Sequence, residues 1–191
     1  MTVEEFGCIK NTIRLRSGRY FDFLAPDPSQ FTLADIGGAL SKICRFGGQI
    51  NRFYSVAEHL VECGRQANED GLPGYVARSV FLHDAHEAFI GDVVKPLKIM
   101  FPDFTTLEWR IDAVIEKKFQ VDFRLHEETI KEIDRAMLIA ERRAFFTPDK
   151  VEWFGEKTVR VIHRNFMGWL PETAEMVFRK MCDAFKLNYD E

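Results

Sequence analysis

Charged and imidazole side chains lie within a segment that is otherwise almost entirely apolar. Residues 75–90 form a predicted helix that is hydrophobic nearly all round, yet they include His83, Asp84 and Glu87. A helix of this kind is expected at the centre of a fold, where charged groups need partners. Residues three and four apart share a helix face, so this one helix presents an imidazole and two carboxylates around a single point.

Another carboxylate interrupts the apolar stripe of a different predicted helix. Within a helix predicted for residues 127–146, Asp134 lies four residues after Ile130 and four residues before Leu138. A buried carboxylate costs several kcal/mol unless a cation or hydrogen bonds compensate it. A metal ion is one of the few adequate partners.

A further polar residue comes from the preceding predicted helix, residues 55–67, where His59 lies near the buried side. Two imidazoles and two carboxylates form a mixed nitrogen and oxygen ligand set that suits Mn²⁺, Co²⁺, Fe²⁺ or Zn²⁺ better than Ca²⁺, with Mg²⁺ as a further candidate. Four protein ligands would leave coordination positions open, as in a catalytic metal site. The predicted ligands are His59, His83, Asp84 and Asp134.

The rest of the chain predicts a mostly α-helical fold. Residues 12–16 and 20–24 alternate apolar and polar residues around Ser17-Gly18, which predicts a small N-terminal β-hairpin. Helical periodicity and capping residues predict helices at 32–44, 55–67, 75–90, 105–119, 127–146 and from 171 onward. A length of 191 residues predicts one domain, with residues 1–30 as hairpin and arm and 147–191 as a C-terminal extension.

Composition limits the classes of partner. The net charge of −4 argues against a protein that coats a nucleic acid polymer, but it permits a small anionic substrate. The 18 phenylalanines predict a core rich in aromatic rings. The four cysteines are scattered without a CxxC pair, and the chain shows neither a signal peptide nor an apolar run of membrane-spanning length. These features predict a cytoplasmic protein with free thiols and no membrane partner.

The order His59, His83-Asp84, Asp134 resembles the H…HD…D motif of the HD-domain phosphohydrolase superfamily. The stretch HDAHEAFIGD at 83–92, followed by Lys95-Pro96, is similar to that of bacterial 5′-deoxynucleotidases and of phage dATP triphosphohydrolases. The resemblance covers roughly residues 38–140.

The resemblance implies a role for each matching residue. It assigns the metal to the four ligands above, proton transfer to Glu87 and the sugar 3′-hydroxyl to Asp92. Arg45-Phe46 matches an Arg-Trp pair of the 5′-deoxynucleotidases, so Arg45 would neutralise the phosphate during catalysis, and Phe46 would contact sugar or base in place of tryptophan. Lys95 would hold phosphate.

Other polar residues are weaker candidates. Lys98 could also contact phosphate, and His86 is expected on a different helix face, at the surface or behind the ligands. His126 and His163 have no partners at metal spacing.

The expected function is hydrolysis of the 5′ phosphoester of a (deoxy)nucleotide, which releases the nucleoside with phosphate or triphosphate. The alternatives are an HD hydrolase of a cyclic nucleotide or alarmone, and a non-catalytic nucleotide sensor. Related enzymes form dimers or larger rings, so the resemblance also implies a homo-oligomer.

Overall fold

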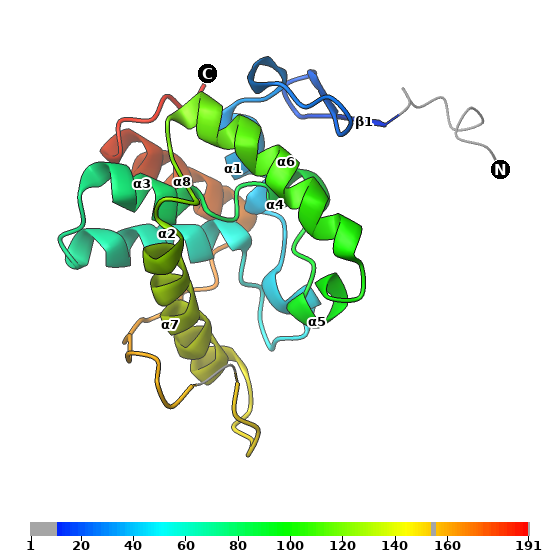
Figure 1. The fold of residues 1–191 in the computed structure, drawn as a ribbon. Helices are drawn as coiled ribbons and strands as arrows, with labels where there is room; N and C mark the ends of the chain where they lie inside the picture. The colour runs from blue at the N-terminus through cyan, green and yellow to red at the C-terminus, as the bar shows by residue number, and fades with distance from the viewer. Residues whose placement is uncertain (1–10, 154–155, 191) are drawn as a thin grey trace.

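Helices make up most of the structure, a computed structural model that describes residues 11–153 and 156–190 (Figure 1). This confirms the predicted mostly helical fold with a small N-terminal hairpin. The elements are β1 (Thr12–Arg14), β2 (Tyr20–Asp22), the 3₁₀ turns η2 (Pro28–Gln30) and η3 (Arg45–Gly48), α1 (Leu33–Leu40), α2 (Val56–Glu69), α3 (Gly74–Leu82), α4 (Glu87–Ile90), α5 (Lys95–Lys98), α6 (Pro102–Phe119), α7 (Glu127–Phe145) and α8 (Pro171–Ala184).

The hairpin is shorter than its sequence pattern. β1 and β2 pair antiparallel, with Ile13 opposite Phe21. Gly18, in the connecting turn, has a φ of +86°, a conformation that glycine adopts without strain. Phe21 stacks on Phe89 of α4 with ring centroids 4.1 Å apart, and this contact ties the hairpin to the helical core.

Aromatic rings occupy much of the core, as the composition predicts. Phe81 of α3 packs against Phe178 of α8 with ring centroids 4.7 Å apart, and both side chains are fully buried. α1 approaches α8 closely at Gly37, where a Cβ atom would lie 2.7 Å from Phe178 Cδ1. The backbone N–H of Ala34 in α1 also donates to the carbonyl oxygen of Tyr189 at 2.8 Å. The C-terminal segment is therefore built into the core.

The single helix predicted for residues 75–90 is wrong. The chain forms α3, then a tight turn through residues 83–86, then α4. In this turn the amide groups of Ala85 and Glu87 donate to carbonyls three residues back rather than four. The Val80 carbonyl oxygen, a normal helical acceptor, receives a hydrogen bond from His83 Nδ1 instead. The break therefore places His83 and Asp84 in a turn instead of within a continuous helix.

Two other predicted boundaries change. α6 begins at Pro102 rather than Thr105, because proline fits the first turn of a helix, where its missing N–H is not needed. α1 ends at Leu40 rather than Cys44. Ser55 caps the start of α2, because its side-chain oxygen accepts a hydrogen bond from the Glu58 N–H at 3.1 Å.

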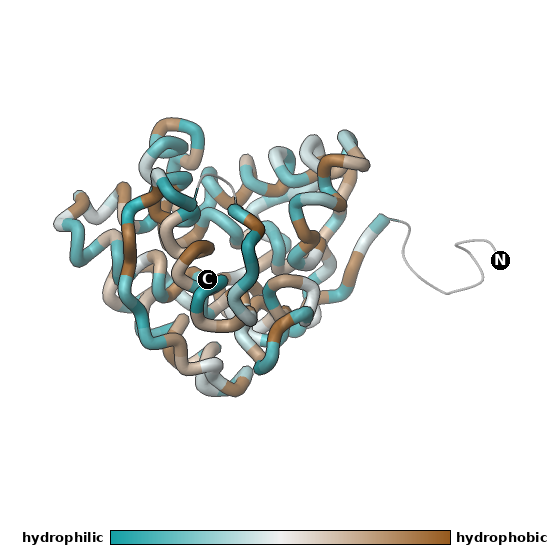
Figure 2. Tube along the Cα trace, turned by 90° about the horizontal axis from the view of Figure 1, so that it is seen from below, coloured by the Kyte–Doolittle hydropathy of each residue, from teal (hydrophilic) through white to brown (hydrophobic). Residues whose placement is uncertain are grey.

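The described helices include none that is both long and apolar enough to cross a membrane. Figure 2 shows hydrophilic and hydrophobic residues interspersed along the helices, without a long hydrophobic segment.

Glu58 ties α2 to the segment that leads into α8. It is fully buried and accepts hydrogen bonds from the backbone N–H groups of Met167, Gly168 and Trp169 at 2.9, 3.0 and 2.7 Å. Replacing Glu58 with alanine would leave these donors without their acceptor.

We therefore expect Glu58→Ala to lower the free energy of unfolding by about 3 kcal/mol, measured by urea denaturation. The control is Glu69→Ala, which breaks an exposed α2 ion pair with Arg164 and should cost less than about 1 kcal/mol. Equal losses in the two variants would contradict the anchoring role of Glu58.

Candidate metal centre

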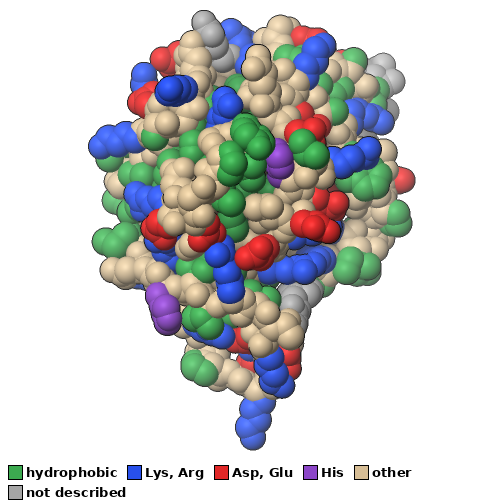
Figure 3. All heavy atoms as spheres, turned by 60° about the vertical axis from the view of Figure 1, so that its left-hand side comes forward, with side chains coloured by type: hydrophobic (Ala, Val, Ile, Leu, Met, Phe, Trp, Pro, Cys, Tyr) green, Lys and Arg blue, Asp and Glu red, His purple; other side chains and the backbone are tan. Residues whose placement is uncertain are grey.

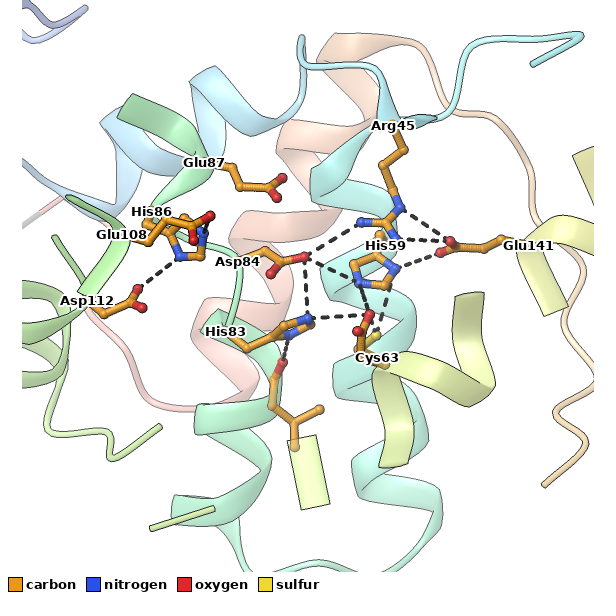
Figure 4. A network of polar contacts seen from close by, with 12 residues as sticks. Arg45, His59, Cys63, His83, Asp84, His86, Glu87, Glu108, Asp112 and Glu141 are labelled. Atoms are coloured by element: carbon orange, nitrogen blue, oxygen red, sulfur yellow. Dashed lines mark hydrogen bonds and ion pairs between the residues drawn. The ribbon is translucent and has the colours of Figure 1, made fainter. Parts of the chain in front are cut away.

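Four side chains from three segments meet where α2 and α7 pack beside the turn after α3 (Figure 4). His59 lies in the first turn of α2, His83 and Asp84 lie in the turn, and Asp134 lies on α7. One nitrogen or oxygen atom from each of the four lies within 4.8 Å of the others. The structure thus brings together all four predicted metal ligands.

Each imidazole faces both carboxylates. His59 Nε2 lies 3.3 Å from Asp134 Oδ1 and 3.8 Å from Asp84 Oδ2. His83 Nε2 lies 3.4 Å from Asp84 Oδ2 and 3.7 Å from Asp134 Oδ1. The ligand atoms therefore surround one small region.

In each imidazole, the hydrogen bond that Nδ1 makes fixes the protonation state of Nε2, the nitrogen that faces the two carboxylates. His83 Nδ1 donates to the Val80 carbonyl oxygen at 2.8 Å, and His59 Nδ1 donates to Glu141 Oε1 at 2.6 Å. A proton on Nδ1 leaves the Nε2 lone pair directed inward, which is how histidine ligands are held at metal centres. Among the described residues, the buried His83 Nε2 has no hydrogen-bond partner. The donor set and this orphaned nitrogen fit a divalent transition metal ion.

The electrostatics of the four groups favour a cation. Burial disfavours a charged His83, but Asp84 and Asp134 outweigh it and hold the His83 pKa well above its usual value. Burial likewise opposes ionisation of Asp134, but the adjacent imidazoles of His59 and His83 hold the Asp134 pKa well below its usual value. Two ionised carboxylates therefore call for positive charge, either protons on the imidazoles or a metal ion between them.

The centre is closed on one side and accessible on the other. His59 is fully buried, whereas the side chains of Asp84 and Asp134 are 21% and 37% exposed. The apolar stripe of α7 predicts a buried Asp134, but this residue lies at the rim. The centre is therefore exposed to solvent on the carboxylate side.

Glu141 supports the centre, and our sequence analysis did not identify it. Its fully buried carboxylate accepts hydrogen bonds from His59 Nδ1, from Tyr54 Oη at 2.9 Å and from Arg45 Nε at 3.2 Å. Burial raises its pKa, but Arg45 and His59 outweigh that effect and lower the pKa below its usual value. Glu141 follows Asp134 by seven residues, two helical turns along the same face, and this spacing is the signal that could have revealed it.

Arg45 lies between Glu141 and the candidate metal centre. It is 7% exposed, and its Nη1 lies 3.6 Å from Asp84 Oδ2 while Nη2 lies 3.2 Å from Glu141 Oε2. The predicted phosphate-binding residue is therefore at the edge of the candidate centre, and carboxylates hold its guanidinium in place.

Glu87 borders the centre on the α4 side. It is 3% exposed, and its Oε2 has no hydrogen-bond partner among the described residues. Burial, together with the charges of Asp84 and Asp92, raises the pKa of Glu87 to about 8. This raised pKa favours the protonated form of the Glu87 carboxyl group.

His86 is not on the surface, which corrects one of the two predicted positions; its side chain is buried beside Asp84 and Glu87 and pairs with residues of α6. It is 7% exposed; its Nδ1 donates to Asp112 at 2.9 Å and its Nε2 lies 3.4 Å from Glu108. Burial lowers its pKa, but Asp112 and Glu108 outweigh this and raise it to about 10. Asp84, His86 and Glu87 also place ligand atoms within 4.8 Å of one another. Protonated His86 already supplies positive charge to this second group.

The two candidate phosphate lysines differ in position. Lys95 is exposed at the first residue of α5, whereas Lys98 is half-buried, with its Nζ 2.6 Å from Glu108 Oε1 and 3.8 Å from Glu87 Oε1. The geometry therefore favours Lys98 as the cation beside the centre.

The remaining candidates divide into two groups. The backbone N–H of Phe46 donates to Asp92 Oδ2 at 3.2 Å, so these two predicted substrate residues adjoin each other. His126 precedes α7 beside the ring of Tyr75, and His163 is exposed; neither belongs to the metal-ligand groups found among the described residues.

The fold and the site define a helical protein with a two-histidine, two-carboxylate centre. No model of a known protein family matches the chain. The uncharacterized protein YfdR of Escherichia coli is 36% identical over 141 residues, which cover 74% of this chain and 76% of YfdR. The uncharacterized protein RCAP_rcc00048 of Rhodobacter capsulatus is 34% identical over 111 residues, 56% of this chain and 57% of that protein. The chain belongs to the family of YfdR.

Metal content tests the ligand assignment. Purified protein is expected to hold about one transition metal ion per chain, and Asp134→Ala should lose it because a charged ligand is removed. The control is Glu132→Ala, which removes an exposed carboxylate from the same helix and should retain the metal. Full occupancy of the Asp134→Ala variant in elemental analysis would refute the assignment.

Glu141 should tune the centre without touching the metal. We expect Glu141→Gln to weaken metal affinity by about 10- to 100-fold, because it removes the carboxylate charge that orients His59. Competition with a fluorescent chelator measures this affinity, and an unchanged value would show that Glu141 is needed only for packing.

Proposed function

We propose that this protein is a metal-dependent phosphohydrolase that cleaves the 5′ phosphoester of nucleotides, with a preference for deoxynucleotides. The single observation that carries the proposal is the partly exposed group of His59, His83, Asp84 and Asp134 next to the buried Glu87, whose Oε2 has no hydrogen-bond partner among the described residues. A divalent metal ion bound there supplies Lewis acidity toward water and phosphoryl oxygens.

Each neighbouring residue has a chemical task in this proposal. The raised pKa of Glu87 favours its protonated form, which can donate a proton to the leaving O5′ atom. The Nη1 edge of Arg45 faces the centre and can neutralise a phosphoryl oxygen. Asp92 can accept a hydrogen bond from a 3′-hydroxyl beside Phe46.

A small substrate suits the surface better than a nucleic acid polymer. On the face shown in Figure 3, basic and acidic side chains are interspersed. The net charge of −4 also disfavours a long polyanion.

The deciding experiment is a screen for release of phosphate and triphosphate from all nucleoside mono- and triphosphates, with Mn²⁺ or Co²⁺ added. Release of nucleoside with either product supports the proposal and fixes the phosphate number. Cleavage confined to cyclic nucleotides or alarmones would favour the alternative HD hydrolase, and nucleotide binding without release would favour a sensor.

Glu87→Gln is expected to keep the metal and to lose about 10²- to 10⁴-fold in kcat, the usual contribution of a general acid or base. Since the protonated form donates, wild-type kcat should fall as pH rises through the pKa of Glu87, which a bound metal ion lowers from its value of about 8 in the metal-free protein. Asp103→Asn, an exposed change on α6, is the control. A Glu87→Gln variant with wild-type kcat would contradict the proton-transfer role.

A further inference from the structure

An aromatic cluster joins the C-terminal segment to the candidate centre. The ring of Phe46 lies 5.2 Å from that of Phe146 and 6.4 Å from that of Trp153, and Phe146 lies 5.2 Å from Trp153. All three side chains are half-buried rather than sealed in the core. Three aromatic rings from distant parts of the sequence therefore lie together, each partly exposed to solvent.

This cluster borders the metal-ligand group through Arg45. The guanidinium carbon of Arg45 lies 5.4 Å from the Phe46 ring centroid, and Arg45 Nη1 reaches Asp84. Phe46 has a φ of +59°, which is unusual for a non-glycine residue, and its N–H is held by Asp92. Strained backbone of this kind persists where surrounding contacts fix it, often at ligand sites.

Arg142 holds the indole ring of Trp153 in place. Its guanidinium carbon lies 4.8 Å from the Trp153 ring centroid, and it pairs with Glu156 and with Asp149 at 2.7 Å. Phe146 also lines a cavity of about 470 Å³ together with residues 147–152. The segment after α7 thus carries the Trp153 ring, which Arg142 holds, and lines a neighbouring cavity.

We propose that Phe46, Phe146 and Trp153 form a stacking platform for the nucleobase of the substrate. This inference rests on the proposed function and deepens it, since it assigns binding of the base to Phe46 together with Phe146 and Trp153, which follow α7. Recognition through π-faces tolerates every base, so binding is expected to depend on a base being present more than on its identity.

The test compares two substrates that share one phosphoester. For 2′-deoxyadenosine 5′-monophosphate, we expect Trp153→Leu and Phe146→Leu to lower kcat/KM by about tenfold to a hundredfold, the usual value of stacking one base. For 2-deoxyribose 5-phosphate, which has no base, the same variants should change kcat/KM less than about twofold. Trp153→Phe keeps a ring and should retain most of the activity. Trp109→Leu, at an exposed tryptophan of α6, should match wild type on both substrates.

Equal losses on the two substrates, or no loss on either, would overturn the platform while leaving the proposed function intact. If wild-type protein hydrolyses neither of these monophosphates, the phosphate and triphosphate screen above decides the proposed function, and tryptophan fluorescence decides the platform. Quenching by 2′-deoxyadenosine 5′-monophosphate that Trp109→Leu keeps and Trp153→Leu loses would uphold it. Quenching absent from wild type, or retained in Trp153→Leu, would refute it.

Discussion

The buried carboxylate of Glu141 is the constraint on which the site depends. A fully buried charge is costly unless donors surround it, and here they come from three parts of the chain: Arg45 of η3, Tyr54 before α2, and His59 within α2. Satisfying Glu141 therefore fixes the position of η3 and α2 against α7. The same hydrogen bond that satisfies Glu141 also turns His59 Nε2 toward Asp84 and Asp134.

The break between α3 and α4 supplies the other half of the centre. A continuous helix over residues 75–90 would carry His83 and Asp84 along one axis, whereas the turn lets His83 bond the Val80 carbonyl and face His59. The turn also separates the ligands from Glu87, which begins α4 and stays buried with one unpartnered oxygen among the described residues. The four predicted ligands and Glu87 thus occupy adjacent but distinct positions.

Periodicity and capping predicted most helices, and polar residues in apolar helices predicted the group that the structure assembles around His59 and Asp134. These signals are local: a stripe shows which side of a helix is buried, and a Ser55 cap shows where a helix begins. The turn at 83–86 was missed because it depends on a side chain taking a backbone acceptor. The contacts of Glu58 with residues 167–169 and of Phe46 with Trp153 were missed because they join segments about a hundred residues apart. Glu141 lay within reach of the same spacing argument that identified Asp134.

The central claim is that one metal ion lies among the four side chains, and anomalous diffraction at the metal edge tests it most directly. In crystals grown with Mn²⁺, the account predicts one anomalous peak about 2.0–2.3 Å from Nε2 of His59 and His83 and from oxygens of Asp84 and Asp134. A peak elsewhere on the chain with none at this position, or coordination through Nδ1 of either histidine, would contradict it.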